Sequence, residues 1–133
     1  MPNQKRILVD MSATILHHGH TRLLRKAAEL GEVVVALTAD IEVKKRKGYL
    51  PEIPFAYRKE ILLSIRYVSQ VIESPWLIND DYLEKNNIDL LVHGNDNSND
   101  VSPEKLLILP RTEGVSSSNI RSKSAQIFNS LER

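Results

Sequence analysis

Short apolar runs alternate with amphipathic stretches along this chain. The runs at residues 7–9 and 33–37 are continuously apolar, which is typical of strands covered on both faces of a parallel sheet. Between them, apolar residues recur at helical spacing from Leu23 to Leu30, and Gly31 supplies a helix stop signal. This part of the chain therefore predicts one strand-helix-strand unit.

The same alternation continues to the C-terminus. Residues 39–54 are charged and contain Gly48, Pro51 and Pro54, which predicts a long loop and a helix that begins after Pro54. The remaining pattern predicts a strand at 71–72, a helix at 80–86, strands at 88–92 and 106–109, and a helix opened by the serines at 116–118. We therefore expect one domain over residues 1–133, a Rossmann-like three-layer α/β/α fold with a five-stranded parallel sheet.

Composition narrows the classes of protein that fit this pattern. The chain has 133 residues, 41% hydrophobic and 26% charged, as in ordinary globular domains. Eighteen Lys and Arg against 17 Asp and Glu leave a net charge of +1. This charge is too small to create a broad positive field that would hold a nucleic-acid backbone. Cysteine is absent, and no segment approaches the roughly 18 apolar residues of a membrane span. We expect a cytoplasmic protein with neither nucleic-acid nor membrane partners.

Polar loops follow several of the predicted strands. Because the carboxyl ends of parallel strands lie at one edge of a sheet, these loops should meet there. They are His-His-Gly-His at 17–20, Gly-Asn-Asp at 94–96 and Arg-Thr-Glu-Gly-Val-Ser-Ser at 111–117, joined by the basic run at 44–47. A basic run is most often a solvated loop, and that reading stays open.

The histidines stand at a predicted helix start. His17 and His20 are three residues apart, so both imidazoles can lie on one side of the first turn, and Gly19 lets a ligand approach the backbone. Helix N-termini bind phosphate through free N–H groups. A metal site, or chance placement of histidines at a polar helix start, are the alternatives.

The segment from Arg111 joins a bidentate phosphate donor to a glycine turn and a row of hydroxyls at a helix start. It is the arrangement expected of an anion-binding loop, although an ordinary serine cap beside an exposed arginine has the same composition. Asp96 could accept from an amino group, hold Mg²⁺ through water, or serve as a turn residue.

Taken together, these segments resemble the HxGH cytidylyltransferases of the nucleotidyltransferase superfamily, most closely those acting on glycerol 3-phosphate. Residues 17–20 match HxGH, and residues 58–62 with 65–68 resemble the helix of the family. Residues 110–117, Pro-Arg-Thr-Glu-Gly-Val-Ser-Ser, resemble its PRTEGIST-type segment. This last match is the most specific, because HxGH also occurs in adenylyltransferases.

The resemblance implies transfer of CMP from CTP to a phosphorylated small molecule, with Mg²⁺, release of pyrophosphate and a homodimeric enzyme. It leaves metal ligands unassigned. It implies catalytic roles for His17, His20, Lys44 and Arg111; nucleotide contacts from Ser12, Ala13, Gly19, Asp96, Thr112, Ser116 and Ser117; and acceptor contacts from Lys44, Arg46, Arg58 and Trp76. Arg58 could equally be structural, and Trp76 could equally be a packing residue.

Two departures leave the substrates open. The family usually has Gly-Thr-Phe-Asp before HxGH, where this chain has Met-Ser-Ala-Thr at 11–14, and Asn95 replaces one of two acids. Met11 is expected to narrow the nucleotide approach. The acceptor is first expected to be glycerol 3-phosphate, with phosphocholine, phosphoethanolamine, a phosphonate or a sugar phosphate as alternatives. An HxGH adenylyltransferase and a non-catalytic nucleotide-binding relative are the rival functions.

Overall fold

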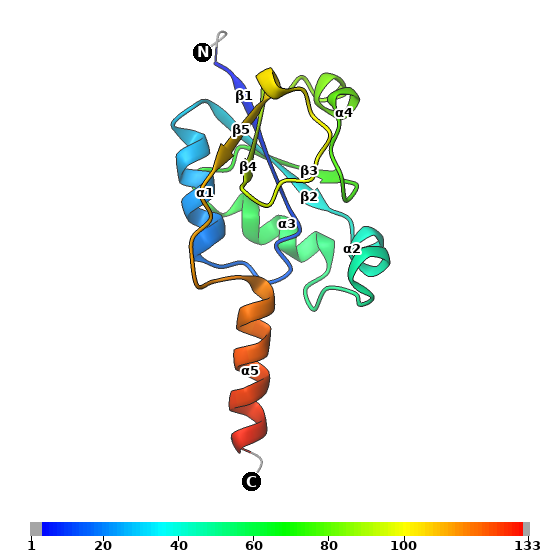
Figure 1. The fold of residues 1–133 in the computed structure, drawn as a ribbon, viewed down its shortest axis with the longest axis vertical. Coiled ribbons are helices and arrows are strands. Elements are labelled where there is room, and N and C mark those ends of the chain that lie inside the picture. Colours follow the sequence, from blue (N-terminus) through cyan, green and yellow to red (C-terminus); the bar gives the residue numbers. More distant parts are fainter. Residues whose placement is uncertain (1–3, 132–133) are drawn as a thin grey trace.

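Residues 4–131 are described by a computed structural model (Figure 1). The elements along the chain are β1 (Arg6–Met11), α1 (His18–Ala28), β2 (Glu32–Thr38), α2 (Asp40–Lys47), α3 (Phe55–Leu63), β3 (Gln70–Ser74), α4 (Asp80–Lys85), β4 (Leu90–Gly94), a 3-10 turn (Pro103–Lys105), β5 (Leu106–Leu109) and α5 (Ser117–Leu131). The strands form one sheet in the order β3-β2-β1-β4-β5, and every pairing is parallel. The predicted five-stranded parallel sheet is confirmed.

Helices cover both faces of the sheet. On one face, Leu24 and Ala27 of α1 and Leu62 of α3 pack against alternate strand residues such as Val9 and Val35. On the other face, Leu83 of α4 packs with the intervening strand residues, which are Leu8, Val34, Ala36 and Leu91. Because successive strand side chains point to opposite faces, continuous apolar strands are needed to supply both clusters. This is the predicted three-layer arrangement.

The expectation of a long loop over residues 39–54 was wrong for its first half, whereas residues 48–54 are a loop. Residues Asp40–Lys47 form α2, followed by Gly48 in the left-handed conformation at φ 85°. Acidic residues lie in the first turn of α2 and the basic run lies in its last turn, so both complement the helix dipole. The charge density that suggested a loop therefore suits a short surface helix that buries only Val43.

The order of the strands places a crevice at the carboxyl edge of the sheet. From β1 the chain winds outward through β2 to β3, and then crosses back to place β4 and β5 on the other side of β1. The connections leaving β1 and β4 thus diverge, which is the usual position of a ligand site in such sheets. Helix α5 begins near this edge and projects from the body (Figure 1). None of the helices in residues 4–131 is long and apolar enough to cross a membrane.

Candidate active site

A cavity of about 960 Å³ opens at the carboxyl edge of the sheet. Its walls come from the end of β1, the first turns of α1, the end of β4 and the segment that leads into α5. It brings together most of the residues predicted from the sequence, namely Ser12, His17, Gly19, His20, Trp76, Asp96, Arg111, Thr112, Ser116 and Ser117. The predicted convergence of three loops is thus present in the fold.

The two histidines of the 17–20 motif form the N-terminal cap of α1. The Nδ1 atom of His17 accepts a hydrogen bond from the Gly19 N–H at 3.1 Å, and the Nδ1 atom of His20 accepts one from the His17 N–H at 3.1 Å. The ring centroids lie 3.9 Å apart. Since Nδ1 is the acceptor in both rings, each neutral imidazole carries its proton on Nε2. Both residues line the cavity.

Both rings are held in the neutral form. Burial lowers the pKa of His20 to about 3, with smaller contributions from His17 and Arg111. Burial also lowers the pKa of His17, assisted by the nearby His18 and Arg111. Neutral rings whose Nδ1 atoms are engaged offer Nε2–H as their remaining polar group, which suits them to donate to phosphate oxygens.

Gly19 has a packing reason to be glycine. A Cβ atom at this position would lie 2.9 Å from Cε1 of His17 and 3.3 Å from a side-chain carbon of Val115. The His17 ring cannot move away without breaking its cap to the Gly19 N–H. The missing side chain therefore lets the HxGH turn approach the segment that precedes α5.

The start of α5 is tied to the loop after β1. The Ser117 hydroxyl donates to the Ile15 carbonyl at 2.8 Å, and the Ile15 N–H donates to Ser117 Oγ at 3.2 Å. Ser116 caps the helix by accepting from the Asn119 N–H at 2.9 Å. One turn later, Arg121 binds both carboxylate oxygens of Glu52, at 2.6 and 2.8 Å. Two helix N-termini, of α1 and α5, are thus fixed around one cavity.

Helix α2 contributes the basic and aromatic part of the wall. The Arg46 guanidinium lies 5.4 Å and the Lys47 ammonium 5.8 Å from the ring centroid of Trp76. The backbone N–H of Trp76 donates to the Glu42 carboxylate at 3.2 Å, which anchors this residue to the same helix. Lys47 and Trp76 line the cavity, whereas Lys44 and Arg46 are exposed side chains outside the lining.

Two other predicted residues lie outside the cavity lining. Arg58 is 2% exposed and its guanidinium donates to the backbone carbonyls of Ser12, Thr38 and Ile53 and to the Asp40 carboxylate. It therefore ties the ends of β1 and β2 to α2 and α3 from behind the cavity. Ala13 is 4% exposed, belongs to the core and has a φ of 45°, a strained conformation for alanine.

Two of the residues that depart from the family pattern, Met11 and Thr14, are buried, whereas Asn95 is exposed. Met11 is 9% exposed, packs in the core and lines the cavity. Thr14 is fully buried, and its hydroxyl receives a hydrogen bond from Arg121 at 3.4 Å. Arg121 is also paired with Glu52, which lies in another loop. A carboxylate of that loop is thus linked through Arg121 to position 14, where the family pattern has an aspartate.

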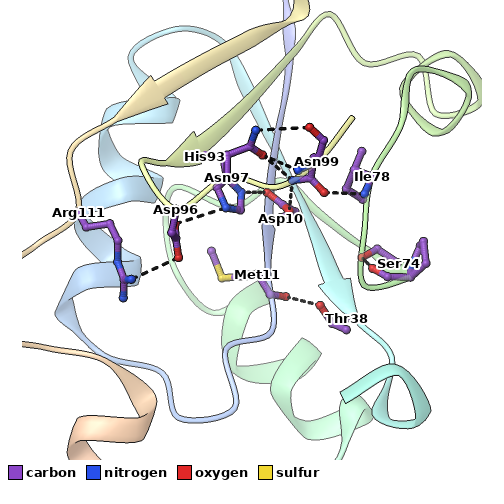
Figure 2. A network of polar contacts seen from close by, with 11 residues as sticks. Asp10, Met11, Thr38, Ser74, Ile78, His93, Asp96, Asn97, Asn99 and Arg111 are labelled. Carbon is purple, nitrogen blue, oxygen red and sulfur yellow. Dashed lines mark hydrogen bonds and ion pairs between the residues drawn. The ribbon is translucent and has the colours of Figure 1, made fainter. Parts of the chain in front are cut away.

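Several cavity residues were missed by sequence reasoning, and three of them form a polar network. Asp10 and His93 follow the apolar runs of β1 and β4, and Asn99 lies in the loop after β4. Figure 2 shows them with Asp96 and Arg111 in one polar network. A polar residue directly after a buried strand was the available signal, but it does not say which strands become neighbours.

The part of the chain that the structure describes contains no group of three or more His, Cys, Asp or Glu arranged to hold a metal ion. The clustered histidines instead use their Nδ1 atoms to cap α1. Asp96 lies against His93 at 3.5 Å and Arg111 at 3.3 Å, so both of its oxygens face cations of the protein. The donor set of this cavity fits anionic phosphates better than a bare metal ion.

A parallel α/β sheet with two capped helix N-termini, neutral imidazoles and an arginine around one edge cavity defines a nucleotide-binding protein of the Rossmann-like class. Comparison with known proteins makes this specific. The chain belongs to the cytidylyltransferase-like family, whose profile matches residues 12–108.

Named relatives cover most of the chain. It is 38% identical to glycerol-3-phosphate cytidylyltransferase of Staphylococcus aureus (strain NCTC 8325 / PS 47), over 88% of this chain and 92% of that protein. It is 33% identical to ethanolamine-phosphate cytidylyltransferase of Dictyostelium discoideum, over 86% of this chain and 35% of that protein. It is 40% identical to FAD synthase of Pyrococcus horikoshii (strain ATCC 700860 / DSM 12428 / JCM 9974 / NBRC 100139 / OT-3), over 68% of this chain and 63% of that protein.

Proposed function

We propose that this protein transfers CMP from CTP to a phosphate oxygen of a small phosphorylated acceptor and releases pyrophosphate. The observation that carries the proposal is the joining of His17, His20 and Arg111 in one cavity at the sheet edge, in a chain of the cytidylyltransferase-like family. The relatives named for glycerol 3-phosphate and ethanolamine phosphate support a phosphorylated acceptor.

The proposed reaction is a direct in-line displacement. An acceptor phosphate oxygen forms a bond to the α-phosphorus of CTP while the bond from that phosphorus to the bridging oxygen of pyrophosphate breaks. Charge spreads over the phosphoryl oxygens and the leaving group, so catalysis depends on positioned donors. The Nε2–H groups of His17 and His20 and the guanidinium of Arg111 supply such donors.

The other residues are assigned supporting roles. We propose that the starts of α1 and α5, with Gly19, Ser116 and Ser117, receive nucleotide phosphates, and that Ser12, Ala13, Thr112 and Asp96 surround the nucleoside. Lys44, Arg46 and Trp76 are proposed to face the acceptor, joined by Lys47, which lines the cavity. Arg58 is buried against backbone carbonyls, and this favours a structural role over contact with the acceptor. Mg²⁺ is proposed to accompany CTP on its phosphate oxygens.

The decisive experiment follows pyrophosphate from purified protein with each nucleoside triphosphate, Mg²⁺ and a panel of phosphorylated acceptors. We expect release with CTP and one acceptor, with glycerol 3-phosphate tested first. The panel also contains phosphoethanolamine, phosphocholine, an aminoalkylphosphonate and a sugar phosphate. Release with no combination would favour the non-catalytic nucleotide-binding relative.

An adenylyltransferase is the second candidate, because the chain is 40% identical to an FAD synthase over 93 residues. The same assay separates the two functions, since an adenylyltransferase requires ATP and remains inactive with CTP. The cytidylyltransferase-like profile and the longer match to the glycerol-3-phosphate enzyme favour CTP.

We also propose that the enzyme is a homodimer. Helix α5 has no buried residue, and Ile127, Phe128 and Leu131 are 62%, 64% and 75% exposed. Large apolar side chains clustered on one projecting helix are unfavourable in water and favour association with a second copy. A homodimer is also what the resemblance of the sequence to the HxGH cytidylyltransferases implies.

A further inference from the structure

His93 lies between two carboxylates at the carboxyl end of β4 (Figure 2). Its Nδ1 atom is 2.5 Å from Oδ1 of Asp10, and its Nε2 atom is 3.5 Å from Oδ1 of Asp96. A carboxylate can only accept hydrogen bonds, so both ring nitrogens face acceptors. The arrangement therefore suits the doubly protonated, positively charged imidazolium.

Asp10 is a fixed anchor for this ring. Its side chain is 10% exposed, and its second oxygen accepts from the Asn99 side-chain amide at 3.0 Å. Asn99 in turn accepts from the Ile78 N–H at 2.7 Å. The His93 side chain is itself 19% exposed. The Asp10–His93 pair is thus held from β1, from β4 and from the loop that follows β4.

From His93 the contacts continue to the far side of the cavity. Asp96, 57% exposed, reaches Nη1 of Arg111 through its second oxygen at 3.3 Å. Asp10, His93, Asp96 and Arg111 therefore form a line of alternating charges that begins in the sheet and ends on the segment leading into α5. Each member is flanked only by opposite charge, which favours one arrangement of the flexible arginine.

Gly94 shows how tightly this line is packed. A Cβ atom on Gly94 would lie 3.0 Å from Cγ of Arg111 and 3.0 Å from Oδ1 of Asp96. The backbone of β4 thus approaches both side chains closely, and the two are pressed together at the cavity wall. An arginine held in this way loses less conformational freedom when it binds an anion.

We infer that His93 is a positioning residue for the nucleotide: anchored on Asp10, it holds Asp96 and through it orients Arg111 toward the phosphates of CTP. This rests on the proposed function, because it assumes that CTP occupies the cavity. The imidazolium also offsets part of the negative charge of the two carboxylates, which would otherwise repel a polyanion more strongly. His93 itself need not touch the substrate.

The charged groups around His93 determine how its effect depends on pH. Burial by itself lowers the pKa of His93, but the hydrogen bond and charge of Asp10 and the charge of Asp96 outweigh both burial and Arg111, so the pKa is raised. Tyr82 of α4 faces Asp10, and burial raises the pKa of its hydroxyl to about 12, so it stays neutral. The imidazolium is therefore lost as the pH rises through the raised pKa of His93, above 6.5.

The test uses two variants, each of which preserves the contact that one ring nitrogen makes with a carboxylate. In His93→Asn the amide replaces Nδ1 and can keep the contact with Asp10, while in His93→Gln it replaces Nε2 and can keep the contact with Asp96. Both lose the positive charge. We expect the Kd for CTP, measured by calorimetry with Mg²⁺, to rise about tenfold in both variants, and kcat to fall as well, because Arg111 is also a proposed transition-state donor.

The pH profile and a cycle of variants separate positioning from general damage. In the wild type the Kd for CTP should rise at alkaline pH as His93 loses its proton. We call this rise the alkaline limb of the pH profile, and both variants should lack it. Asp96→Asn should weaken CTP binding, and its effect should be non-additive with that of His93→Asn. Lys85→Gln, which removes one exposed positive charge outside the cavity lining, is the control and should keep the alkaline limb.

Several results would overturn the inference while leaving the proposed function intact. They are an unchanged CTP affinity in folded His93→Asn and His93→Gln, an alkaline limb that survives in both, or a change confined to the KM of the acceptor. A wild-type protein that binds no CTP would instead overturn the proposed function, and the inference with it. Thermal melting of each variant confirms that a folded protein is measured.

Discussion

At the scale of single residues, the same side chains serve as structure and as chemistry. His17 and His20 use Nδ1 to cap α1 and thereby leave Nε2 as the donor on the cavity side. With a pKa of about 3, His20 stays neutral at any pH at which the protein is expected to work. Since the unfolded histidine would take up a proton below about 6.5, this burial also costs stability as the pH falls from 6.5 toward 3.

His17→Asn separates the two roles of this residue. Asparagine is a strong N-cap and keeps an acceptor for the Gly19 N–H, but it has no equivalent of the Nε2–H donor. We expect kcat to fall about 10² to 10³-fold with little change in the melting temperature. His17→Ala, the comparison, should lose similar activity and in addition about 1 kcal/mol of stability. Near-normal turnover of His17→Asn would exclude the proposed catalytic role.

At the scale of elements, short connections determine how the helices meet the sheet. Gly31 joins α1 to β2 where the chain passes close to the start of β1. A Cβ atom at Gly31 would lie 2.3 Å from the Lys5 carbonyl oxygen, which accepts a hydrogen bond from the Glu32 N–H at 2.8 Å. The constraint here is space beside another strand, which the helix-stop signal in the sequence does not reveal.

Gly31→Ala should therefore lower the free energy of unfolding by about 2 to 3 kcal/mol, because backbone must shift to accept the methyl group. Gly48→Ala is the control, since Gly48 has a φ of 85° but no atom within 4 Å of the added Cβ. It should cost about 1 kcal/mol through backbone strain alone. Urea unfolding measures both, and an equal or smaller loss for Gly31→Ala would refute the steric explanation.

At the scale of the whole molecule, the body and α5 differ in how their apolar residues are used. The two faces of the sheet bury continuous clusters under α1, α3 and α4, whereas α5 extends from the body with its apolar side chains exposed (Figure 1). Its first turns are secured by Ser117 and Arg121, so the helix is attached at the cavity end only. Its remaining turns are available to a second copy.

Light scattering of the variant with both Ile127→Ser and Phe128→Ser tests this assembly. We expect a dimeric wild type at micromolar concentration and a monomeric, folded variant, because the exposed apolar area of α5 is removed. Leu50→Ser changes a similarly exposed apolar residue, 59% exposed, outside α5 and should leave the dimer intact. A wild type that stays monomeric over the whole concentration range would contradict the proposed homodimer.

The sequence by itself determined the parallel sheet and the phosphate-suited residues of the cavity at 17–20 and 111–117. Strand type can be predicted because burial on both faces demands continuous apolar runs, and the polar loops can be grouped because parallel strands end at one edge. The motifs at 17–20 and 111–117 are local in sequence, so their cap and hydroxyl chemistry was visible without coordinates. Helix α2 was missed because its charged residues stabilise helix ends, which resemble a charged loop in composition.

Only the tertiary structure decided which distant residues became partners. Arg58 reaches the carbonyls of Ser12 and Thr38 because α3 packs behind the ends of β1 and β2. Asp10 and His93 meet because β4 pairs with β1, although 83 residues separate them in the chain. Strand order depends on how the whole chain packs its apolar surface, and a linear pattern does not encode it. The local pattern therefore predicts the phosphate-binding loops, and the order of the strands creates the charged line that joins them.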